Sequence, residues 1–308
     1  MKNVVITGAG GFIGRNLTQK LLSNGITVYG IDIFPERLDS LRGSGNLITI
    51  EANLIQNFEI KDVISDNSID AFFHLAWKGY GKDSNNFDIQ LENVRETYNA
   101  AHAAGKLNCA NFIIACSSHE YQKSSYNDVI GNAEGPSSIY GASKTAAKAY
   151  AKVVAHKSGM GFNGAIFTNV FGVGDYSNRT ANYFIQQLLE GKPLNLVLGD
   201  KPYDWVYIDD VVEGLIRIAE KGIRGKEYYV GNTELRPFRQ IIEEVRDIIA
   251  PQVEINCGAY NDTSYIDYSS IDTYELYRDT GFLAKCDFKE SIRKTVDWLQ
   301  TNNKAGKD

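Results

Sequence analysis

Short apolar runs alternate with segments of helical periodicity along the first 170 residues of the chain. The apolar runs lie at residues 3–7, 27–33, 47–51, 70–76, 110–117 and 162–170, and helical patterns occupy 12–24, 36–42, 59–66, 86–104 and 140–158. Strands that are hydrophobic throughout are typical of parallel sheets covered by helices on both faces. The alternation therefore predicts an α/β fold of the Rossmann type, with a doubly wound parallel sheet over residues 1–170.

The pattern becomes less regular after Gly174. Helical segments are expected at 180–190, 210–221, 238–249, 271–280 and 288–300, and strand-like runs at 204–208 and 227–231. These segments predict a smaller C-terminal α/β lobe over residues 171–308. We expect some of them to return to the main sheet, so the boundary is not a simple linker.

Charge and hydropathy narrow the possible partners. The chain has 32 Lys and Arg against 38 Asp and Glu, a net charge of −6, and no basic run. Nucleic acid is therefore disfavoured, because a polyanion needs a basic surface. The longest apolar runs are too short and too rich in glycine to cross a bilayer, and no leader pattern follows Met1. We expect a cytoplasmic protein with no membrane partner.

Cysteine and histidine spacing gives no metal-binding pattern. The cysteines lie far apart without a CxxC pair, and the histidines lack ligand spacing; these residues are Cys109, Cys116, Cys257, Cys286, His74, His102, His119 and His156. We predict neither a metal site nor a disulfide framework.

A glycine-rich turn follows the first predicted strand and leads into the first predicted helix. Gly8, Gly11 and Gly14 have GxxGxxG spacing in "VVITGAGGFIGRNL". Glycines there let backbone N–H groups and a helix N-terminus approach a pyrophosphate closely. The alternative is a turn in which glycine serves only for packing.

An acidic residue ends the second predicted strand. Asp32 lies 18 positions after Gly14, where a carboxylate can accept hydrogen bonds from both ribose hydroxyls of a dinucleotide. Its charge would repel the 2′-phosphate of NADP, so NAD is favoured. Arg15 and Arg37 could hold a phosphate and keep NADP as an alternative.

A phenol and an ammonium lie four positions apart in "SSIYGASKTAAK". Tyr140 and Lys144 would share one helical face, and a nearby cation favours the ionised form of a phenol. This pair could therefore exchange protons near neutral pH. The alternative is a packing aromatic beside a solvated surface lysine.

Several motifs occur together and in order. They are TGAGGFIG at 7–14, HLAW at 74–77, ENV at 92–94, CSSHEY at 116–121, YGASK at 140–144, TNVFGVGD at 168–175, YDWVYIDDVV at 203–212 and FKESIRKTVDWL at 288–299. With them the chain resembles the extended short-chain dehydrogenase/reductase family, and within it the nucleotide-sugar epimerases, dehydratases and reductases. The similarity covers nearly the whole chain and implies that residues 171–308 bind substrate.

The resemblance assigns roles to individual residues. It implies that Tyr140 donates or accepts the proton, that Lys144 lowers the pKa of Tyr140 and binds the nicotinamide ribose, and that Ser117 binds the reacting oxygen. It places the cofactor against Gly8, Gly11, Phe12, Ile13, Gly14, Asp32, Asn53, Leu54, Leu75, Ala76 and Asn93, although Asn93 could equally be a satisfied buried amide. It places the substrate against Ser118, His119, Asn169, Arg179 and Tyr203. It also implies a homodimer formed through helices 86–104 and 140–158.

Departures from the family pattern bear on the reaction. Ser118 and His119 stand where dehydratases carry an Asp-Glu pair, which disfavours 4,6-dehydration, although His119 or Glu120 could still act as an acid. An NAD-dependent 4-epimerase of a nucleotide-activated sugar is the favoured expectation. A 4-ketoreductase of a nucleotide sugar is the first alternative.

The resemblance implies two arginines that hold the diphosphate of the substrate, and this sequence has other residues at both positions. Tyr203 stands at one position and Thr263, Ser264 and Tyr265 occupy the other, so either Arg179, Lys201 or Arg236 compensates or the substrate lacks a diphosphate. The second case would suit a dehydrogenase of a free sugar, a sugar acid or another small alcohol. A non-catalytic protein that senses NAD is a further alternative.

Overall fold

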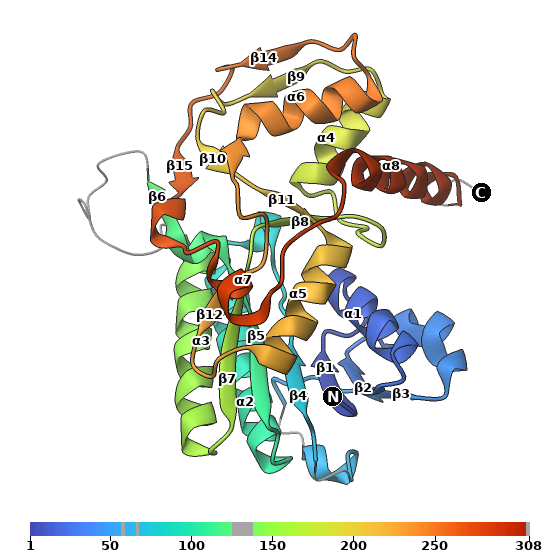
Figure 1. Cartoon of the computed structure of the whole chain (residues 1–308), viewed down its shortest axis with the longest axis vertical. Helices are drawn as coiled ribbons and strands as arrows, with labels where there is room; N and C mark the ends of the chain where they lie inside the picture. The colour runs from blue at the N-terminus through green and yellow to red at the C-terminus, as the bar shows by residue number, and fades with distance from the viewer. Residues whose placement is uncertain (57–58, 66–67, 125–137, 306–308) are drawn as a thin grey trace.

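Seven parallel strands form the central sheet, in the order β12-β7-β5-β4-β1-β2-β3 (Figure 1). The computed structural model describes residues 1–56, 59–65, 68–124 and 138–305. The strands are β1 (Asn3–Thr7), β2 (Thr27–Asp32), β3 (Leu47–Glu51), β4 (Ala71–His74), β5 (Asn111–Ser117), β7 (Gly161–Phe167) and β12 (Glu227–Tyr229). This arrangement confirms the predicted doubly wound Rossmann-type sheet.

Helices cover both faces of this sheet. Side chains alternate along β1, so Val4 and Ile6 pack in one hydrophobic cluster and Val5 packs in another on the opposite face. The first face holds α1 (Phe12–Ser23) and α5 (Ile208–Lys221), and the second holds α2 (Phe87–Lys106) and α3 (Ile139–Lys157) (Figure 1). In such sheets ligands bind at the carboxyl ends of the strands.

A smaller lobe lies above the sheet in Figure 1. Its helices are α4 (Thr180–Leu189), α6 (Phe238–Ile249) and α8 (Phe288–Ala305). The short helix α7 (Glu275–Thr280) lies instead against α5 and β12 of the large sheet (Figure 1). The strands of the lobe pair two by two: β8 (Asn169–Phe171) with β11 (Trp205–Tyr207), β10 (Pro202–Tyr203) with β13 (Arg236–Pro237), β9 (Leu194–Leu196) with β14 (Ile255–Cys257), and β15 (Ser264–Ile266) with β6 (Gln122–Ser124). The division of the chain near residue 170 stays a prediction, and β12, from beyond that point, joins the large sheet.

Some predicted elements differ from the structure. The helices expected at 36–42 and 59–66 are the 3-10 helices η1 (Pro35–Ser44) and η2 (Ile60–Asp62), with residue 66 outside the described part of the chain. The strand expected at 162–170 divides into β7 and β8, because β8 leaves the sheet to pair with β11. The helix expected at 271–280 shortens to α7, preceded by the 3-10 helix η5 (Tyr268–Ser270). The remaining 3-10 helices are η3 (Gly81–Asp83) and η4 (Ser118–Tyr121).

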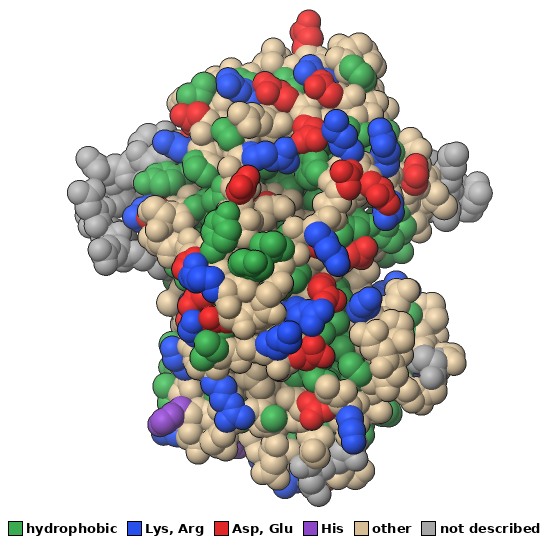
Figure 2. Space-filling view, viewed as in Figure 1, with side chains coloured by type: hydrophobic (Ala, Val, Ile, Leu, Met, Phe, Trp, Pro, Cys, Tyr) green, Lys and Arg blue, Asp and Glu red, His purple; other side chains and the backbone are tan. Residues whose placement is uncertain are grey.

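The next features are the distribution of charge on the surface and the apolar character of the helices. Figure 2 shows acidic and basic side chains interspersed over one face rather than gathered into a single basic field. Within the described residues, no helix has the length and apolar character needed to span a membrane.

Candidate active site

The glycine-rich turn between β1 and α1 packs against the end of β4. A Cβ atom on Gly14 would lie 2.1 Å from the carbonyl oxygen of Gly8, so a larger residue does not fit there. Gly8 has a φ of +67°, and a Cβ on it would lie 2.7 Å from the backbone nitrogen of Ala76. The turn therefore stays close to the crevice at the carboxyl ends of β1 and β4.

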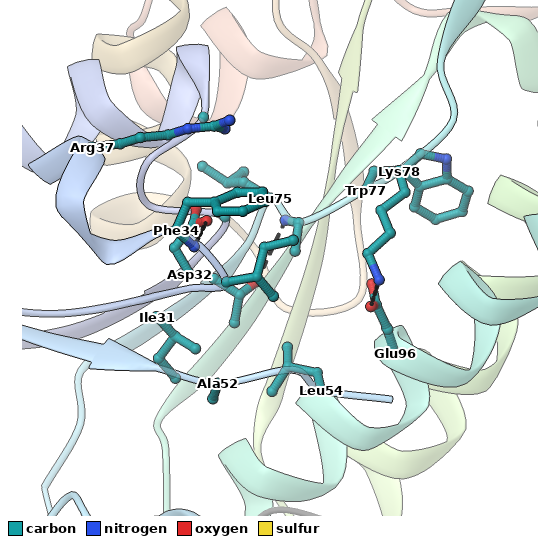
Figure 3. A pocket seen from close by; sticks show the side chains of 15 residues that line it. Ile31, Asp32, Phe34, Arg37, Ala52, Leu54, Leu75, Trp77, Lys78 and Glu96 are labelled. Carbon is teal, nitrogen blue, oxygen red and sulfur yellow. Dashed lines mark hydrogen bonds and ion pairs between the residues drawn. The ribbon is translucent and has the colours of Figure 1, made fainter. Parts of the chain in front are cut away.

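The predicted ribose-binding carboxylate ends β2. Asp32 is 9% exposed, and its Oδ2 atom accepts a hydrogen bond from the backbone nitrogen of Gly10 at 2.8 Å. Its Oδ1 atom accepts one from the backbone nitrogen of Phe34 at 3.0 Å. Because a carboxylate has about four lone-pair positions, acceptor positions remain for further donors. Asp32 lines a cavity of about 270 Å³, which we call the first cavity (Figure 3).

The first cavity gathers part of the predicted cofactor site. Its lining includes Gly8, Gly11, Asp32, Leu54, Leu75 and Ala76. Phe12 and Ile13 pack against the hydrophobic core instead, and the Oδ1 atom of Asn53 accepts a hydrogen bond from the backbone nitrogen of Ile55 at 3.1 Å. Their contacts with a cofactor stay predictions.

Asn93 braces the loop that follows β4. Its Oδ1 atom accepts a hydrogen bond from the backbone nitrogen of Lys78 at 2.8 Å, and its Nδ2 atom donates one to the backbone oxygen of Lys78 at 2.9 Å. Asn93 is therefore a satisfied buried amide, the alternative that the sequence left open. The Lys78 side chain turns into the first cavity, where its Nζ lies 3.0 Å from Oε1 of the buried Glu96 (Figure 3).

Ser117, Tyr140 and Lys144 lie together where β5 ends and α3 begins. Ser138 caps α3 by accepting a hydrogen bond from the backbone nitrogen of Gly141 at 3.1 Å, which stabilises the turn that carries Tyr140. Tyr140 is buried and shares a side-chain hydrogen bond with Ser117. Lys144 is 5% exposed. The structure thus brings together the three residues predicted to be catalytic.

Aromatic rings surround Tyr140 edge-on. The ring centroids of Trp77, Tyr80 and His119 lie 5.9, 5.3 and 5.6 Å from that of Tyr140, with interplanar angles of 83°, 78° and 87°. Trp77 lines the first cavity, whereas His119 lines another. Tyr140 therefore lies between two cavities.

Burial controls the acidities of the catalytic pair. Desolvation raises the pKa of Tyr140 above its ordinary value, and the neighbouring Tyr80 raises it further. Desolvation also lowers the pKa of Lys144 from 10.5 to about 8. Burial outweighs the lowering interactions of Tyr140 with Ser117 and Arg179. That Lys144 lowers the pKa of Tyr140 stays a prediction.

The second cavity, of about 230 Å³, is lined by four of the five residues predicted to bind substrate, namely Ser118, His119, Asn169 and Tyr203. Tyr203 shares a side-chain hydrogen bond with Asn169, and burial raises the pKa of its phenol to about 12. Among the described lining residues, Lys201 is the only Lys or Arg, and Asp262 is the only carboxylate. Ser264 and Tyr265, from the position of the second missing arginine, also line this cavity.

Arg179, the fifth predicted substrate residue, lies just before α4. Its guanidinium carbon is 4.5 Å from the centroid of the Tyr80 ring, which in turn contacts Tyr140. Arg236 does not line the second cavity, and its Nη1 atom pairs with Oε2 of Glu244 at 2.5 Å. Of the three cations considered as replacements for the missing arginines, Lys201 is the one that lines the second cavity.

His119 and Glu120 are poorly suited to expel water from a sugar. Burial lowers the pKa of His119, which leaves a neutral imidazole at neutral pH. Glu120 accepts a hydrogen bond from the backbone nitrogen of Ser117 at 2.8 Å, and its Oε2 atom lies 2.7 Å from Nζ of Lys148. Glu120 thus orients Ser117 and the η4 turn rather than facing the second cavity.

Sequence reasoning missed several residues at this site. Trp77 and Lys78 directly follow β4, so the rule that ligands bind at the carboxyl ends of parallel strands could have found them. Glu96 lies one helical turn after Asn93 and shares its face. Tyr80 has no such signal, since its contact with Tyr140 depends on the path of a loop.

Comparison with known proteins identifies the family of the chain. The profile of the NAD dependent epimerase/dehydratase family matches residues 4–231. The chain belongs to this family. A trifunctional UDP-glucose 4,6-dehydratase/UDP-4-keto-6-deoxy-D-glucose 3,5-epimerase/UDP-4-keto-L-rhamnose-reductase of Arabidopsis thaliana is 24% identical over 327 residues, covering 98% of the chain and 47% of the relative. The chain therefore spans about half the length of such plant relatives.

Two solved structures of family members share the fold. The UDP-glucuronic acid 4-epimerase of Bacillus cereus, in complex with UDP-glucuronic acid and NAD, is 23% identical with a TM-score of 0.80, over 97% of this chain and 99% of that one. The UDP-glucose 4-epimerase of Thermotoga maritima, with UDP-glucose, is 20% identical with a TM-score of 0.79, over 98% of this chain and 99% of that one.

Proposed function

We propose that this protein is an NAD-dependent 4-epimerase that acts on a nucleotide-activated sugar, with Tyr140 as the acid/base. The observation that carries the proposal is the place of Tyr140, which Trp77 contacts from the first cavity and His119 from the second. With a dinucleotide in the first cavity and a sugar in the second, the phenol would be within reach of the reacting hydroxyl.

The residues of the first cavity fit NAD. Asp32 has acceptor positions left for ribose hydroxyls, and Gly8 and Gly11 line the first cavity at the N-terminus of α1, where a pyrophosphate would bind. Arg37 stacks on Phe34 at 4.6 Å and could favour NADP, but the carboxylate of Asp32 beside it would repel a 2′-phosphate. NAD is also the cofactor named in the Bacillus cereus structure.

The residues of the chain would divide the work around one sugar hydroxyl. When bound, NAD supplies a hydride acceptor at the reacting carbon and a positive ring that favours nearby anions. Tyr140 takes the hydroxyl proton and later returns it, and Ser117 orients the oxygen through its own hydroxyl. Lys144 supplies a positive charge beside the phenol when it is protonated.

A second candidate is a reductase or dehydrogenase that exchanges its cofactor in each cycle. Tyr203 replaces an arginine expected to hold a diphosphate, and Lys201 is the cation left in the second cavity. The raised pKa of Tyr140 keeps its phenol protonated, which suits proton donation to a carbonyl oxygen during reduction. These observations favour a 4-ketoreductase, or a dehydrogenase of an alcohol that lacks a diphosphate.

The test uses purified protein with UDP-, CDP-, GDP- and dTDP-sugars and no added cofactor, with the products followed by NMR. We expect inversion at C4 of one of these sugars, and loss of turnover in Tyr140→Phe with NAD affinity nearly unchanged. Full activity of Tyr140→Phe would refute the catalytic assignment. Conversion that requires added NADH or NADPH would favour the second candidate. If none of the nucleotides UDP, CDP, GDP and dTDP raises the melting temperature, a nucleotide sugar is excluded as substrate.

We also propose that the enzyme is a cytoplasmic homodimer formed through α2 and α3. Large apolar side chains are exposed on these helices, including Phe87 at 62%, Leu91 at 53% and Tyr150 at 56%. Apolar area of this kind usually marks an interaction site. We expect Leu91→Arg to convert a dimer into a monomer in analytical ultracentrifugation, and a monomeric wild type would refute the proposal.

A further inference from the structure

The ammonium of Lys144 rests on the face of an indole ring. Its Nζ atom lies 3.6 Å from the ring centroid of Trp77 and donates a hydrogen bond to the backbone oxygen of Ala115 at 3.0 Å. The nearby carboxylates are taken up elsewhere, since Glu120 and Glu227 pair with Lys148 at 2.7 and 2.6 Å. The π face of Trp77 is therefore a direct contact of this buried cation, in addition to the charge of Glu120, which also acts on it.

Polar contacts fix the orientation of the indole. Trp77 donates a hydrogen bond from Nε1 to Oε1 of Gln90 at 3.1 Å. Gln90 is fully buried in α2, and its Nε2 atom donates to the backbone oxygens of Gly79 at 2.7 Å and Asp83 at 3.1 Å. The loop after β4 is thereby tied to α2 in a way that turns the ring of Trp77 toward Lys144.

We propose that Trp77 is a positioning residue, which holds the Lys144 ammonium by a cation–π contact and so keeps this lysine charged and oriented beside Tyr140. Tryptophan is the best of the aromatic side chains for this contact, and desolvation strengthens the attraction. The catalytic consequence rests on the function proposed above. The contact itself can be tested in the protein alone.

Other titratable groups near Lys144 come from β4, β5, η4 and its own helix. Burial lowers the pKa of His74 to about 3 and raises the pKa of Cys116 well above its ordinary value. Burial also raises the pKa of Tyr140, and the carboxylate of Glu120 raises that of Lys144. Around pH 8, Lys144 is the group of this cluster that should change its charge.

Tryptophan fluorescence tests the contact directly. The chain has 3 tryptophans, so the difference in emission between the wild type and Trp77→Phe isolates the signal of Trp77. A charged ammonium on the ring alters this emission, and we expect it to titrate with a midpoint near pH 8, the pKa of about 8 for Lys144. Trp298→Phe is the matched control and should titrate as the wild type does. A Trp77 signal without a midpoint within about one unit of that pH would refute the contact.

Replacement of the lysine gives an independent reading. In Lys144→Met the Trp77 signal should be flat across the same range, and Lys144→Gln serves in the same way if the methionine variant does not fold, as judged by circular dichroism. An unchanged titration in either folded variant would assign the signal to another group and overturn the proposal.

Kinetics tests the consequence for catalysis. Trp77→Leu removes the π face, so the pKa of Lys144 should fall and the alkaline limb of the kcat/KM profile should move to lower pH by about one unit. Trp77→Tyr should restore part of that shift. If the Trp77 emission of the wild type titrates but the alkaline limb of Trp77→Leu does not move, the catalytic role of Trp77 is refuted. Failure to turn over any nucleotide sugar would refute the proposed function and leave the fluorescence test intact.

Discussion

Lys144 and Lys148 lie one turn apart on α3 and should affect the pH dependence of stability in opposite ways. Burial lowers the pKa of Lys144 from 10.5 to about 8. At about 1.4 kcal/mol per pKa unit, this difference corresponds to about 3 kcal/mol. The folded protein bears this cost when Lys144 is charged, in return for a cation at the catalytic tyrosine.

The direction in which stability changes with pH follows from proton binding. The folded pKa of Lys144 is below the unfolded one, so the unfolded state binds more protons between about pH 8 and 10.5 and wild-type stability rises with pH in that window. Lys144→Met removes the cost but also the hydrogen bond to Ala115, which contributes about 1 kcal/mol. We expect the variant to be more stable than the wild type by about 2 kcal/mol at pH 7. This advantage should disappear as the pH approaches the unfolded pKa.

Lys148→Met is the matched control. Lys148 pairs with Glu120 and Glu227, and although desolvation opposes it, the charges and hydrogen bonds around Lys148 raise its pKa above the ordinary value. A raised lysine pKa gives stability that is fully present below the unfolded value and lost only as the pH rises through the folded one. Removal of this cation leaves Glu120 buried without its partner and should cost about 3 to 5 kcal/mol, evenly from about pH 6.5 to 10.

Urea unfolding followed by far-UV circular dichroism measures both variants over this range. We expect the stability advantage of Lys144→Met over the wild type to decrease as the pH rises, and the stability loss of Lys148→Met to stay constant. If Lys144→Met is less stable than the wild type by the same amount at every pH, burial of the charged Lys144 does not destabilise the folded protein.

Three further predictions concern the two cavities. Gly14→Ala should lower NAD affinity by about 5- to 150-fold in calorimetry, because its Cβ would lie 2.1 Å from the oxygen of Gly8, and overpacking costs about 1 to 3 kcal/mol. Gly43→Ala, which meets no atom within 4 Å, is its control and should bind NAD normally; equal behaviour of the two would contradict the packing argument. Asp32→Ala should weaken NAD binding and remove the discrimination against NADP, and a preserved preference would exclude this carboxylate as its cause. Tyr203→Arg should tighten UDP binding by roughly tenfold or more in thermal-shift titrations if a diphosphate occupies the second cavity, since a charge-assisted hydrogen bond contributes about 1.5 to 3 kcal/mol.

The sequence predicted the parts of the site that depend on local geometry. The glycine turn and Asp32 belong to one βαβ unit with fixed spacing, and Tyr140 and Lys144 share a helical face, so their placement follows from short-range rules. Four of the residues that line the second cavity were expected too, but not from such rules. These residues lie on β8, β10 and η4, and only the resemblance to the family predicted that they lie together.

Features that depend on burial or on loop paths could not be predicted. The pKa of Tyr140 rises because the surrounding rings exclude water, whereas the sequence showed only a nearby lysine. The contact of Trp77 with Lys144 joins the loop after β4 to a helix more than sixty residues later. In the fold, residues 36–42 belong to a 3-10 helix, and apolar periodicity does not distinguish this form from an α-helix.

The fate of a deuterium atom at C4 tests the central claim most directly. The protein is incubated in ordinary water, without added cofactor, with the nucleotide sugar that it converts, deuterated at C4, and the product is examined by NMR. We expect a product that is inverted at C4 and retains its deuterium, and no product from Tyr140→Phe. Loss of the deuterium to solvent, or inversion by Tyr140→Phe at the wild-type rate, would contradict this claim.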